Sequence, residues 1–263
     1  MDRYAAGKLK AKLKYKLKIF QTADELNKAA VEFIIAAAKK AIAMRGKFII
    51  SLSGGQTPQK LYSLLSESPY REQVQWEKTF VFWDDERCVP LDDERNNAHC
   101  AKFTLLDKID IPESNIYAIP VNLSPGEAAV KYEKELKYFF GKEALRFDLI
   151  LLGLGANGHT ASLFPKTKVI DEQMEGIRAV YVEEEKMFRV TMTAPLINQA
   201  RIILFLVTGE NKAEILKKVF TVSYRPDQIP AQLIKPGDGE LYWFVDGAAS
   251  SLITNENEYS EFT

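Results

Sequence analysis

Short apolar runs recur along the chain, separated by longer segments in which apolar residues return every three or four positions. A continuous apolar run of four to eight residues is typical of a buried strand, whereas the longer periodic segments are typical of amphipathic helices. The runs that we interpret as strands lie at residues 48–52, 79–83, 147–152, 202–207 and 241–245.

Capping residues mark the limits of the intervening helices. Thr22 to Glu25 forms a capping box ahead of apolar residues that recur from Leu26 to Ile42, and Gly46 follows as a stop. Ser124 to Glu127 forms a second capping box with proline at the first helical position, and Gly141 ends that helix. Further helices are predicted at residues 97–106 and at about 211–220.

Strands that alternate with helices predict an α/β fold with a doubly wound, mostly parallel sheet and helices on both faces. No internal repeat or linker stands out, so we expect one domain over residues 1–263. In such sheets, ligands bind beyond the carboxyl ends of the strands. The loops after Leu52, Trp83, Leu152 and Val207 should therefore converge.

Lysine alternates with mostly apolar residues from Lys8 to Ile19. A period of two predicts a strand with one lysine face, such as an edge strand that lysine protects from aggregation. The alternative is a segment for targeting or for binding an anionic surface, although it lacks the arginine and serine of a transit peptide. We interpret residues 1–14 as a lysine-rich extension or as part of the edge strand.

Composition narrows the possible partners. The net charge is −1, so no global field draws the protein to nucleic acid or to a membrane surface. No apolar stretch is long enough to span a membrane. The two cysteines lack C-x-x-C spacing and no secretory signal is recognisable, which favours a reducing, cytoplasmic location. We expect a monomer or weak dimer that binds a small anionic molecule through a local basic cluster.

The loop Ser53-Gly54-Gly55-Gln56-Thr57 follows the first of the central strands. Its glycines let the backbone approach a ligand, and the amino end of the following helix favours an anion. Thr57 is expected to cap this helix, with Pro58 in its first position. The loop is neither a Walker phosphate loop nor a dinucleotide fingerprint. A plain strand-to-helix turn is the alternative interpretation.

A second glycine-rich loop runs from Gly153 to Pro165 and contains His159, one of only two histidines. Histidine titrates near neutral pH and suits a general base, although a histidine that bonds only its own loop is the alternative. The sequence around Ser162 is not a nucleophile elbow, so a serine triad is unsupported. Two isolated histidines make no zinc site, and we expect neither a metal nor an organic cofactor.

Three basic residues stand in or near the converging loops: Arg87 after Asp85 and Glu86, Arg189, and Lys212 at the start of a helix. A lysine in the first helical turn is unfavourable against the helix dipole unless an anion binds there. Each residue alone could be a solvated charge or part of a structural salt bridge. Together they suggest a site for phosphate and carboxylate groups.

These motifs together resemble the 6-phosphogluconolactonases, within the glucosamine-6-phosphate isomerase/deaminase-like group of α/β folds. The resemblance extends from about residue 15 to 250, with the motifs in the family's order. The matching segments are Ser-Gly-Gly-Gln-Thr-Pro at 53–58, Asp-Glu-Arg-Cys-Val-Pro at 85–90 with Asn97 after it, Gly-His-Thr-Ala-Ser-Leu-Phe-Pro at 158–165, Arg-Val-Thr-Met-Thr at 189–193, Asn-Lys-Ala at 211–213 and Trp-Phe-Val-Asp-Gly-Ala-Ala at 243–249.

The resemblance implies hydrolysis of 6-phospho-D-glucono-1,5-lactone to 6-phospho-D-gluconate in the pentose phosphate pathway, without a cofactor. It implies that His159 activates water and that Arg87 belongs to the catalytic set. The positions expected to bind substrate or its phosphate are Ser53, Gly54, Gly55, Thr57, Asp85, Gly158, Arg189 and Lys212.

One position departs from the family. The family usually has Asp-Gly-His where this chain has Asn157-Gly158-His159. Asparagine can hold the loop but cannot offer a negative charge, so the effect of this change stays open. A related deaminase has Phe-Asn-Glu-Pro after its histidine where this chain has Ser-Leu-Phe-Pro at 162–165, which argues against deamination. A sugar-phosphate-binding protein without activity is the remaining alternative.

Overall fold

The computed structural model describes residues 15–253. Six parallel strands form its main sheet, in the order β1-β9-β8-β5-β2-β3. The strands are β1 (Lys16–Phe20), β2 (Phe48–Leu52), β3 (Thr79–Trp83), β5 (Leu149–Gly153), β8 (Ile202–Val207) and β9 (Glu240–Asp246). All five strands expected from apolar runs are present, and their parallel pairing confirms the predicted α/β class.

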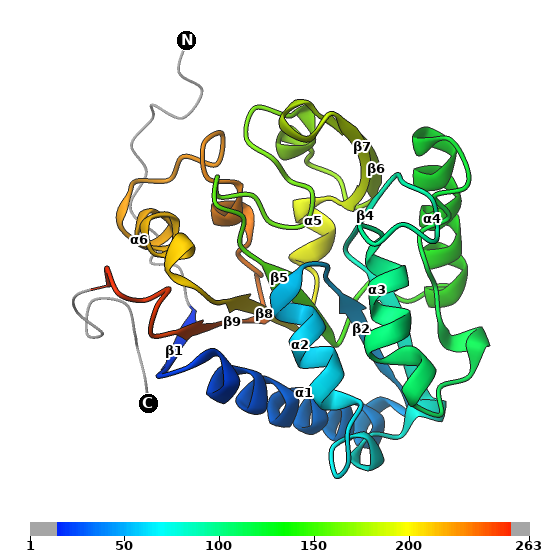
Figure 1. Cartoon of the computed structure of the whole chain (residues 1–263). Coiled ribbons are helices and arrows are strands. Elements are labelled where there is room, and N and C mark those ends of the chain that lie inside the picture. Colours follow the sequence, from blue (N-terminus) through cyan, green and yellow to red (C-terminus); the bar gives the residue numbers. More distant parts are fainter. Residues whose placement is uncertain (1–14, 254–263) are drawn as a thin grey trace.

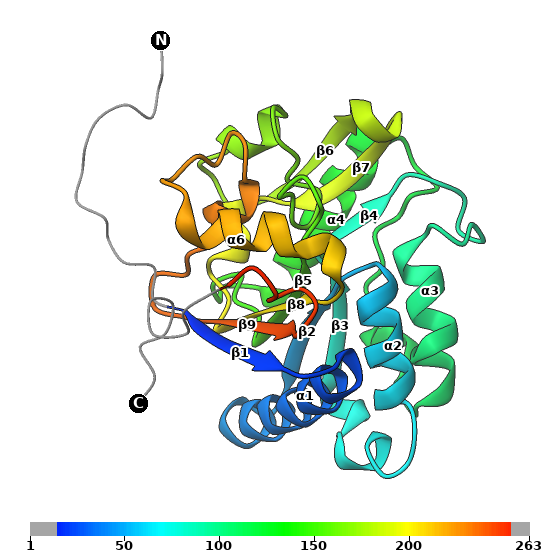
Figure 2. The same ribbon diagram turned by 60° about the vertical axis from the view of Figure 1, so that its left-hand side comes forward.

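Helices cover both faces of this sheet, and Figures 1 and 2 show α1 and α6 on opposite sides of it. The α-helices are α1 (Ala23–Arg45), α2 (Gln56–Leu65), α3 (Asn97–Thr104), α4 (Pro125–Phe140), α5 (Ala194–Ile197) and α6 (Ala213–Thr221). Short 3-10 helices lie at Arg71–Gln73, Trp76–Lys78, Leu106–Lys108, Glu113–Asn115, Lys168–Asp171, Glu183–Glu185, Glu210–Lys212 and Pro230–Leu233.

The predicted helix caps are confirmed for two helices. The Thr22 hydroxyl accepts a hydrogen bond from the Glu25 amide, and Gly46 ends α1 in the left-handed conformation with φ 75°. Ser124 forms the expected capping box of α4. The expected cap of α2 is wrong. Gly55 is its N-cap and Gln56 its first residue, because the glycine takes a φ of 105° that starts the helix before Thr57.

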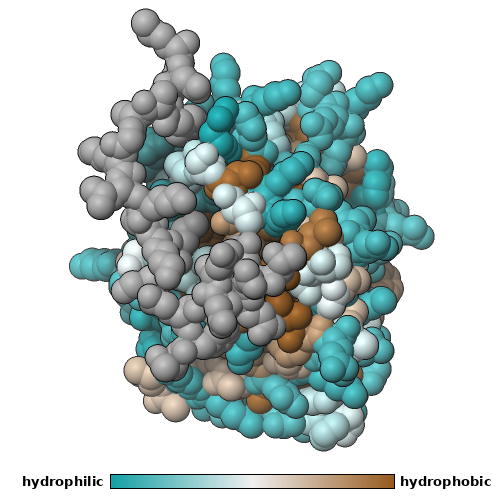
Figure 3. Space-filling model, turned by 90° about the vertical axis from the view of Figure 1, so that its left-hand side faces the viewer, coloured by the Kyte–Doolittle hydropathy of each residue, from teal (hydrophilic) through white to brown (hydrophobic). Residues whose placement is uncertain are grey.

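Strand β1 is an edge strand, as predicted for the lysine-rich segment, but only its last part lies within the described residues. Leu17 is buried while Lys16 and Lys18 are exposed, so period-two alternation persists. Hydrophilic residues dominate the side of the molecule that holds β1 and α6, with a narrow apolar strip among them (Figure 3). Residues 1–14 lie outside the described residues, so their assignment stays a prediction.

A second, antiparallel sheet of three strands was not expected. It consists of β4 (Asp85–Arg87), β7 (Met187–Met192) and β6 (Ile177–Val182), in that order. The expectation of a loop directly after Trp83 is therefore wrong for residues 85–87. They are all charged and form a strand because β7 supplies their backbone partners, with Arg87 opposite Arg189.

The hydrophobic core runs through both sheets. One cluster of buried side chains includes the whole β5 run from Leu149 to Leu152 and extends from Leu17 to Ala249. The assignment of residues 1–263 to one domain stays a prediction. Between residues 15 and 253, no helix is both long enough and apolar enough to cross a membrane.

Candidate active site

The four loops expected to converge meet at the carboxyl edge of the main sheet, because the strands that precede them are parallel neighbours. The hydroxyl of Thr57, in the first turn of α2, lies 2.7 Å from that of Thr208, in the loop after β8. The Asp84 amide donates to the Leu52 carbonyl at 3.2 Å and joins the loops after β3 and β2. The convergence that the sequence predicted is therefore confirmed.

The loop after β5 is a tight turn that delivers His159 to this edge. The Gly155 amide donates to the His159 carbonyl at 2.8 Å, and the Gly158 amide donates to the Gly155 carbonyl at 2.9 Å. Gly158 has a φ of 84°, and its carbonyl accepts from the Ala231 amide at 2.9 Å. Gly158 thus shapes the loop through its backbone.

The ring of His159 is held on two sides. Its Nδ1 lies 2.6 Å from Oδ1 of Asn157, and its face stacks on Phe164 with ring centroids 3.9 Å apart. The same Oδ1 accepts the His159 backbone N–H at 3.2 Å, which identifies that atom as the amide oxygen. An oxygen can only accept, so Nδ1 carries the proton in the neutral ring and Nε2 keeps a lone pair.

The environment keeps His159 neutral. Burial lowers the pKa of His159 to about 4, and the field of Asp85 opposes this shift while that of Arg189 adds to it. Glu185 and Lys212 also act on the pKa of this ring, in opposite directions. At neutral pH the imidazole is therefore an unprotonated base, rather than the group titrating near pH 7 that the sequence suggested.

Asp85 is a structural hub within the site. Its buried carboxylate accepts hydrogen bonds from Ser162 Oγ, from Asn97 Nδ2 at 3.1 Å and from Arg189 at 3.4 Å. Ser162 is completely buried and bonded to this carboxylate, which agrees with its rejection as a nucleophile. Asp85 therefore orders its neighbours from within the protein.

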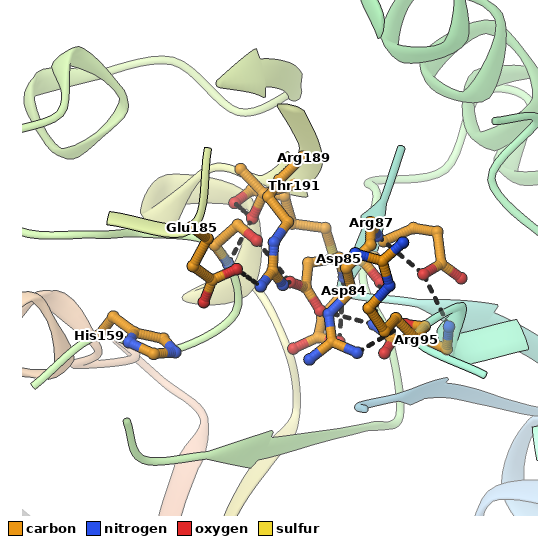
Figure 4. A network of polar contacts seen from close by, with 12 residues as sticks. Asp84, Asp85, Arg87, Arg95, His159, Glu185, Arg189 and Thr191 are labelled. Atoms are coloured by element: carbon orange, nitrogen blue, oxygen red, sulfur yellow. Dashed lines mark hydrogen bonds and ion pairs between the residues drawn. The ribbon is translucent and has the colours of Figure 1, made fainter. Parts of the chain in front are cut away.

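Arg189 is clamped between two carboxylates. Its guanidinium forms ion pairs with Asp85 and with Glu185, and it lies over the Phe164 ring at 5.7 Å. In Figure 4 the side chains run from His159 through Glu185 and Arg189 toward Asp85 and Arg87. The site includes the expected arginine, but its charge is already compensated. Glu185 was not identified as a site residue from the sequence, because nothing in the sequence distinguishes it from a surface glutamate.

Arg87 lies across the Asp85 cluster from His159 in Figure 4, beside Arg95. It donates to the Arg95 carbonyl at 2.7 Å, and its buried Nε has no hydrogen-bond partner among residues 15–253. The structure brings Arg87 to the network around Asp85 without placing it next to His159.

Lys212 is a cation of the site that no carboxylate compensates within residues 15–253. It is half-buried at the N-cap of α6, and within residues 15–253 it forms no ion pair. Burial lowers the pKa of Lys212, and its charge acts on His159. A half-buried cation without a protein partner is the arrangement that an anionic ligand completes.

The loop after β2 is built for close approach. A Cβ on Gly54 would lie 1.9 Å from Oδ1 of Asn97, so only glycine fits there. The hydroxyl of Tyr62 holds the backbone of Ser53 by accepting from its amide at 3.0 Å and donating to its carbonyl at 2.8 Å. The loop ends at the amino end of α2, where backbone amides lack helical partners.

Within the described part of the chain, no group of three or more His, Cys, Asp or Glu side chains could hold a metal ion. The site instead holds a half-buried neutral histidine, a lysine that forms no ion pair within residues 15–253, and the amino end of α2. The fold and this site define an α/β protein whose candidate active site lies at the carboxyl edge of its sheet.

Comparison with known proteins agrees with this class. Residues 21–243 match the family described as glucosamine-6-phosphate isomerases/6-phosphogluconolactonase, and the chain belongs to this family.

Individual relatives cover most of the chain. A 6-phosphogluconolactonase from Synechocystis is 46% identical over 215 residues, which are 80% of this chain and 86% of the relative. A 6-phosphogluconolactonase from Haemophilus influenzae is 38% identical over 89% of this chain and 98% of its own length. The solved 6-phosphogluconolactonase from Trypanosoma cruzi is 28% identical, with a TM-score of 0.81, and covers 92% of this chain and 98% of its own.

Proposed function

We propose that this chain hydrolyses 6-phospho-D-glucono-1,5-lactone to 6-phospho-D-gluconate, the lactonase step of the pentose phosphate pathway. The observation that supports this most directly is the neutral, half-buried His159 at the carboxyl edge of the sheet, whose Nε2 has no hydrogen-bond partner within residues 15–253. Relatives that cover 80% or more of the chain are named for the same activity.

The chemistry needs one positioned base. Nε2 of His159 takes a proton from water while the water oxygen bonds to the lactone carbonyl carbon, C1. The resulting tetrahedral oxyanion collapses, the bond from C1 to the ring oxygen breaks, and the ring oxygen takes the proton back from the imidazolium. Water is thereby added across one ester bond, and neither a covalent enzyme intermediate nor a redox step is required.

Phosphate capture falls to Lys212 and the loop after β2. Lys212 forms no ion pair in the described part of the chain, while Gly54, Gly55 and Thr57 precede or begin α2, whose amide groups favour an anion. Arg189 can join them only by exchanging its contact with Glu185 for the substrate. Arg87 and Ser53 stay assigned to the catalytic and substrate-binding sets on the resemblance alone.

Two alternatives to lactone hydrolysis are deamination of an amino-sugar phosphate and binding of a sugar phosphate without turnover. Deamination of glucosamine 6-phosphate would release ammonia, and the residues at 162–165 argue against it because Ser162 and Phe164 both face inward. A binding protein would retain 6-phosphogluconate without turnover. A cytoplasmic location and a monomeric or weakly dimeric state stay predictions from the sequence.

The test compares freshly prepared 6-phosphogluconolactone with glucosamine 6-phosphate. Acid release well above the spontaneous rate, lost in His159→Ala, is the expected result. Ammonia release from the amino sugar would favour the deaminase. Tight binding of 6-phosphogluconate with no acceleration of acid release would overturn the enzyme assignment.

A further inference from the structure

The tip of the hairpin between β6 and β7 reaches the loop that holds His159. Three consecutive glutamates form this tip, Glu183 to Glu185, in one 3-10 turn that Lys186 closes with a φ of 51°. Glu185 pairs with Arg189, and Glu184 accepts a hydrogen bond from Nδ2 of Asn157 at 2.9 Å. The mechanism proposed above uses neither Glu184 nor this contact.

The side chain of Asn157 therefore lies between a hydrogen-bond acceptor, Glu184, and a hydrogen-bond donor, the backbone N–H of His159. A carboxylate such as Glu184 can only accept, so the atom facing it must be the NH₂ group. The His159 backbone N–H can only donate, so the atom facing it must be the oxygen. Both constraints select one orientation of the amide, and that orientation presents an oxygen to Nδ1 of His159.

Resting on the proposed function, we propose that Glu184 is a positioning residue that fixes the Asn157 amide and thereby holds His159 with its proton on Nδ1 and its lone pair on Nε2. The carboxylate also polarises the amide, because hydrogen bonds in a chain strengthen one another. A more negative Oδ1 then stabilises the imidazolium that forms when Nε2 takes a proton from water. Glu184 supplies this effect from the surface, without touching the substrate.

The contact contributes little to folding. Glu184 is exposed, and a single hydrogen bond at the surface adds little net stability. The contact between Glu184 and Asn157 instead determines which nitrogen of the half-buried His159 ring carries the proton. Partners that hold the second nitrogen of a functional histidine commonly change activity by ~10–100-fold when removed, as measured at metal sites.

The matched pair of variants is Glu184→Gln and Glu183→Gln. Both remove one negative charge from the same turn, but of these two side chains only that of Glu184 forms a hydrogen bond with the loop of His159 among residues 15–253. We expect Glu184→Gln to lower kcat roughly tenfold with an unchanged KM. Glu183→Gln should behave as the wild type.

The pH profile separates positioning from simple loosening. The charged groups that act on His159 from its surroundings are Asp85, Arg189, Glu185 and Lys212, and all of them remain in the variant. Removing the carboxylate behind Asn157 should lower the pKa of His159 and move the acidic limb of kcat/KM to lower pH. If the variant only loosened the loop of His159, water would enter and raise the pKa of His159 toward its ordinary value. The acidic limb of kcat/KM would then move to higher pH.

A readout independent of turnover is the ¹⁵N spectrum of the imidazole rings. The chain has two histidines, so a His99→Gln variant assigns the signals of His159. We expect a ring protonated at Nδ1 in the wild type and a mixture of tautomers in Glu184→Gln. Unchanged tautomers and kcat, a limb that moves to higher pH, or an equal response in Glu183→Gln would each overturn the positioning role. A tautomer change in a protein without lactonase activity would overturn only the proposed function.

Discussion

Gly155 packs so closely against His159 that a side chain at this position would displace the histidine ring. A Cβ at position 155 would lie 2.1 Å from both Cε1 and Nδ1 of the histidine ring, well inside van der Waals contact. The backbone of Gly155 does not take the left-handed conformation, so alanine would be accepted by the backbone and rejected only by the ring. The glycine therefore serves His159 directly.

Gly155→Ala should displace the ring and lower kcat by ~10²-fold, which is the range that general-base catalysis supplies. Gly153→Ala is the matched control, because nothing lies within 4 Å of a Cβ at that position two residues earlier. Steady-state kinetics and thermal unfolding of both variants check this expectation. Normal turnover in a folded Gly155→Ala protein would show that the ring position is not critical.

The second prediction concerns His159 as the base. His159→Ala should lower kcat by ~10²-fold or more, and the wild-type enzyme should lose activity only when this histidine is protonated. In the wild type, protonation of His159 removes the base, and its pKa of about 4 places the acidic limb of kcat/KM near that pH. Activity should thus persist through mildly acidic pH and fall only as pH drops toward 4. A limb near the ordinary histidine pKa of about 6.5 would contradict the desolvation of this half-buried ring.

These features differ in how far the sequence could reveal them. The strand ending at Leu52, the caps at Thr22 and Ser124 and the loop around His159 follow local rules, because apolar runs, capping residues and glycines leave a pattern within a few positions. Their convergence follows from the parallel sheet alone.

The second sheet could not be found in this way. Strand β4 is a charged tripeptide whose partner lies about a hundred residues later, so its pairing with β7 has no local signature. Glu184 and Glu185 look like ordinary surface glutamates until the hairpin brings them to Asn157 and Arg189. Compensation of the Arg189 charge was likewise hidden, because it depends on carboxylates from two different elements.

The third prediction separates the lysine of the site from an ordinary one. Charge-assisted hydrogen bonds contribute ~1.5–3 kcal/mol, so Lys212→Met should raise KM for the phosphorylated lactone roughly tenfold or more. Lys218→Met, an exposed lysine on the same helix, should leave KM unchanged. The non-phosphorylated gluconolactone should not distinguish Lys212→Met from the wild type. Equal KM values for Lys212→Met and wild type on the phosphorylated substrate would place the phosphate elsewhere.

The fourth prediction is that Arg189 supports stability as well as binding. Arg189→Met leaves the buried Asp85 without its cation, and breaking a buried ion pair from one side costs ~3 kcal/mol or more of unfolding free energy. Arg178→Met on the neighbouring strand breaks pairs with Glu133 and Glu172, whose side chains are 22% and 32% exposed, so its cost should stay below ~1 kcal/mol. Urea unfolding of the two variants measures the difference. Equal stabilities would mean that the Asp85 pair is not needed for folding.

The last prediction concerns Asn157→Asp, which restores the residue usual in the family. The new carboxylate would contact Nδ1 of His159 directly, and an opposite charge at that distance raises the pKa of the imidazole. It would also replace the NH₂ group 2.9 Å from Glu184 with an oxygen, and two carboxylates cannot share a hydrogen bond. Because Glu184 is exposed, its side chain can turn into solvent. We therefore expect an acidic limb at higher pH and a kcat within a few-fold of wild type.

The double variant shows whether Glu184 acts through Asn157. In the wild type, Glu184→Gln should cost roughly tenfold in kcat, because the amide loses the carboxylate that orients it. In the Asn157→Asp background the same change should cost nothing, since an aspartate holds Nδ1 of His159 in either orientation and no longer needs Glu184. The two effects are then strongly non-additive, as expected for residues in one hydrogen-bonded chain. A further tenfold loss in the double variant would mean that Glu184 acts on the site by a route that bypasses residue 157.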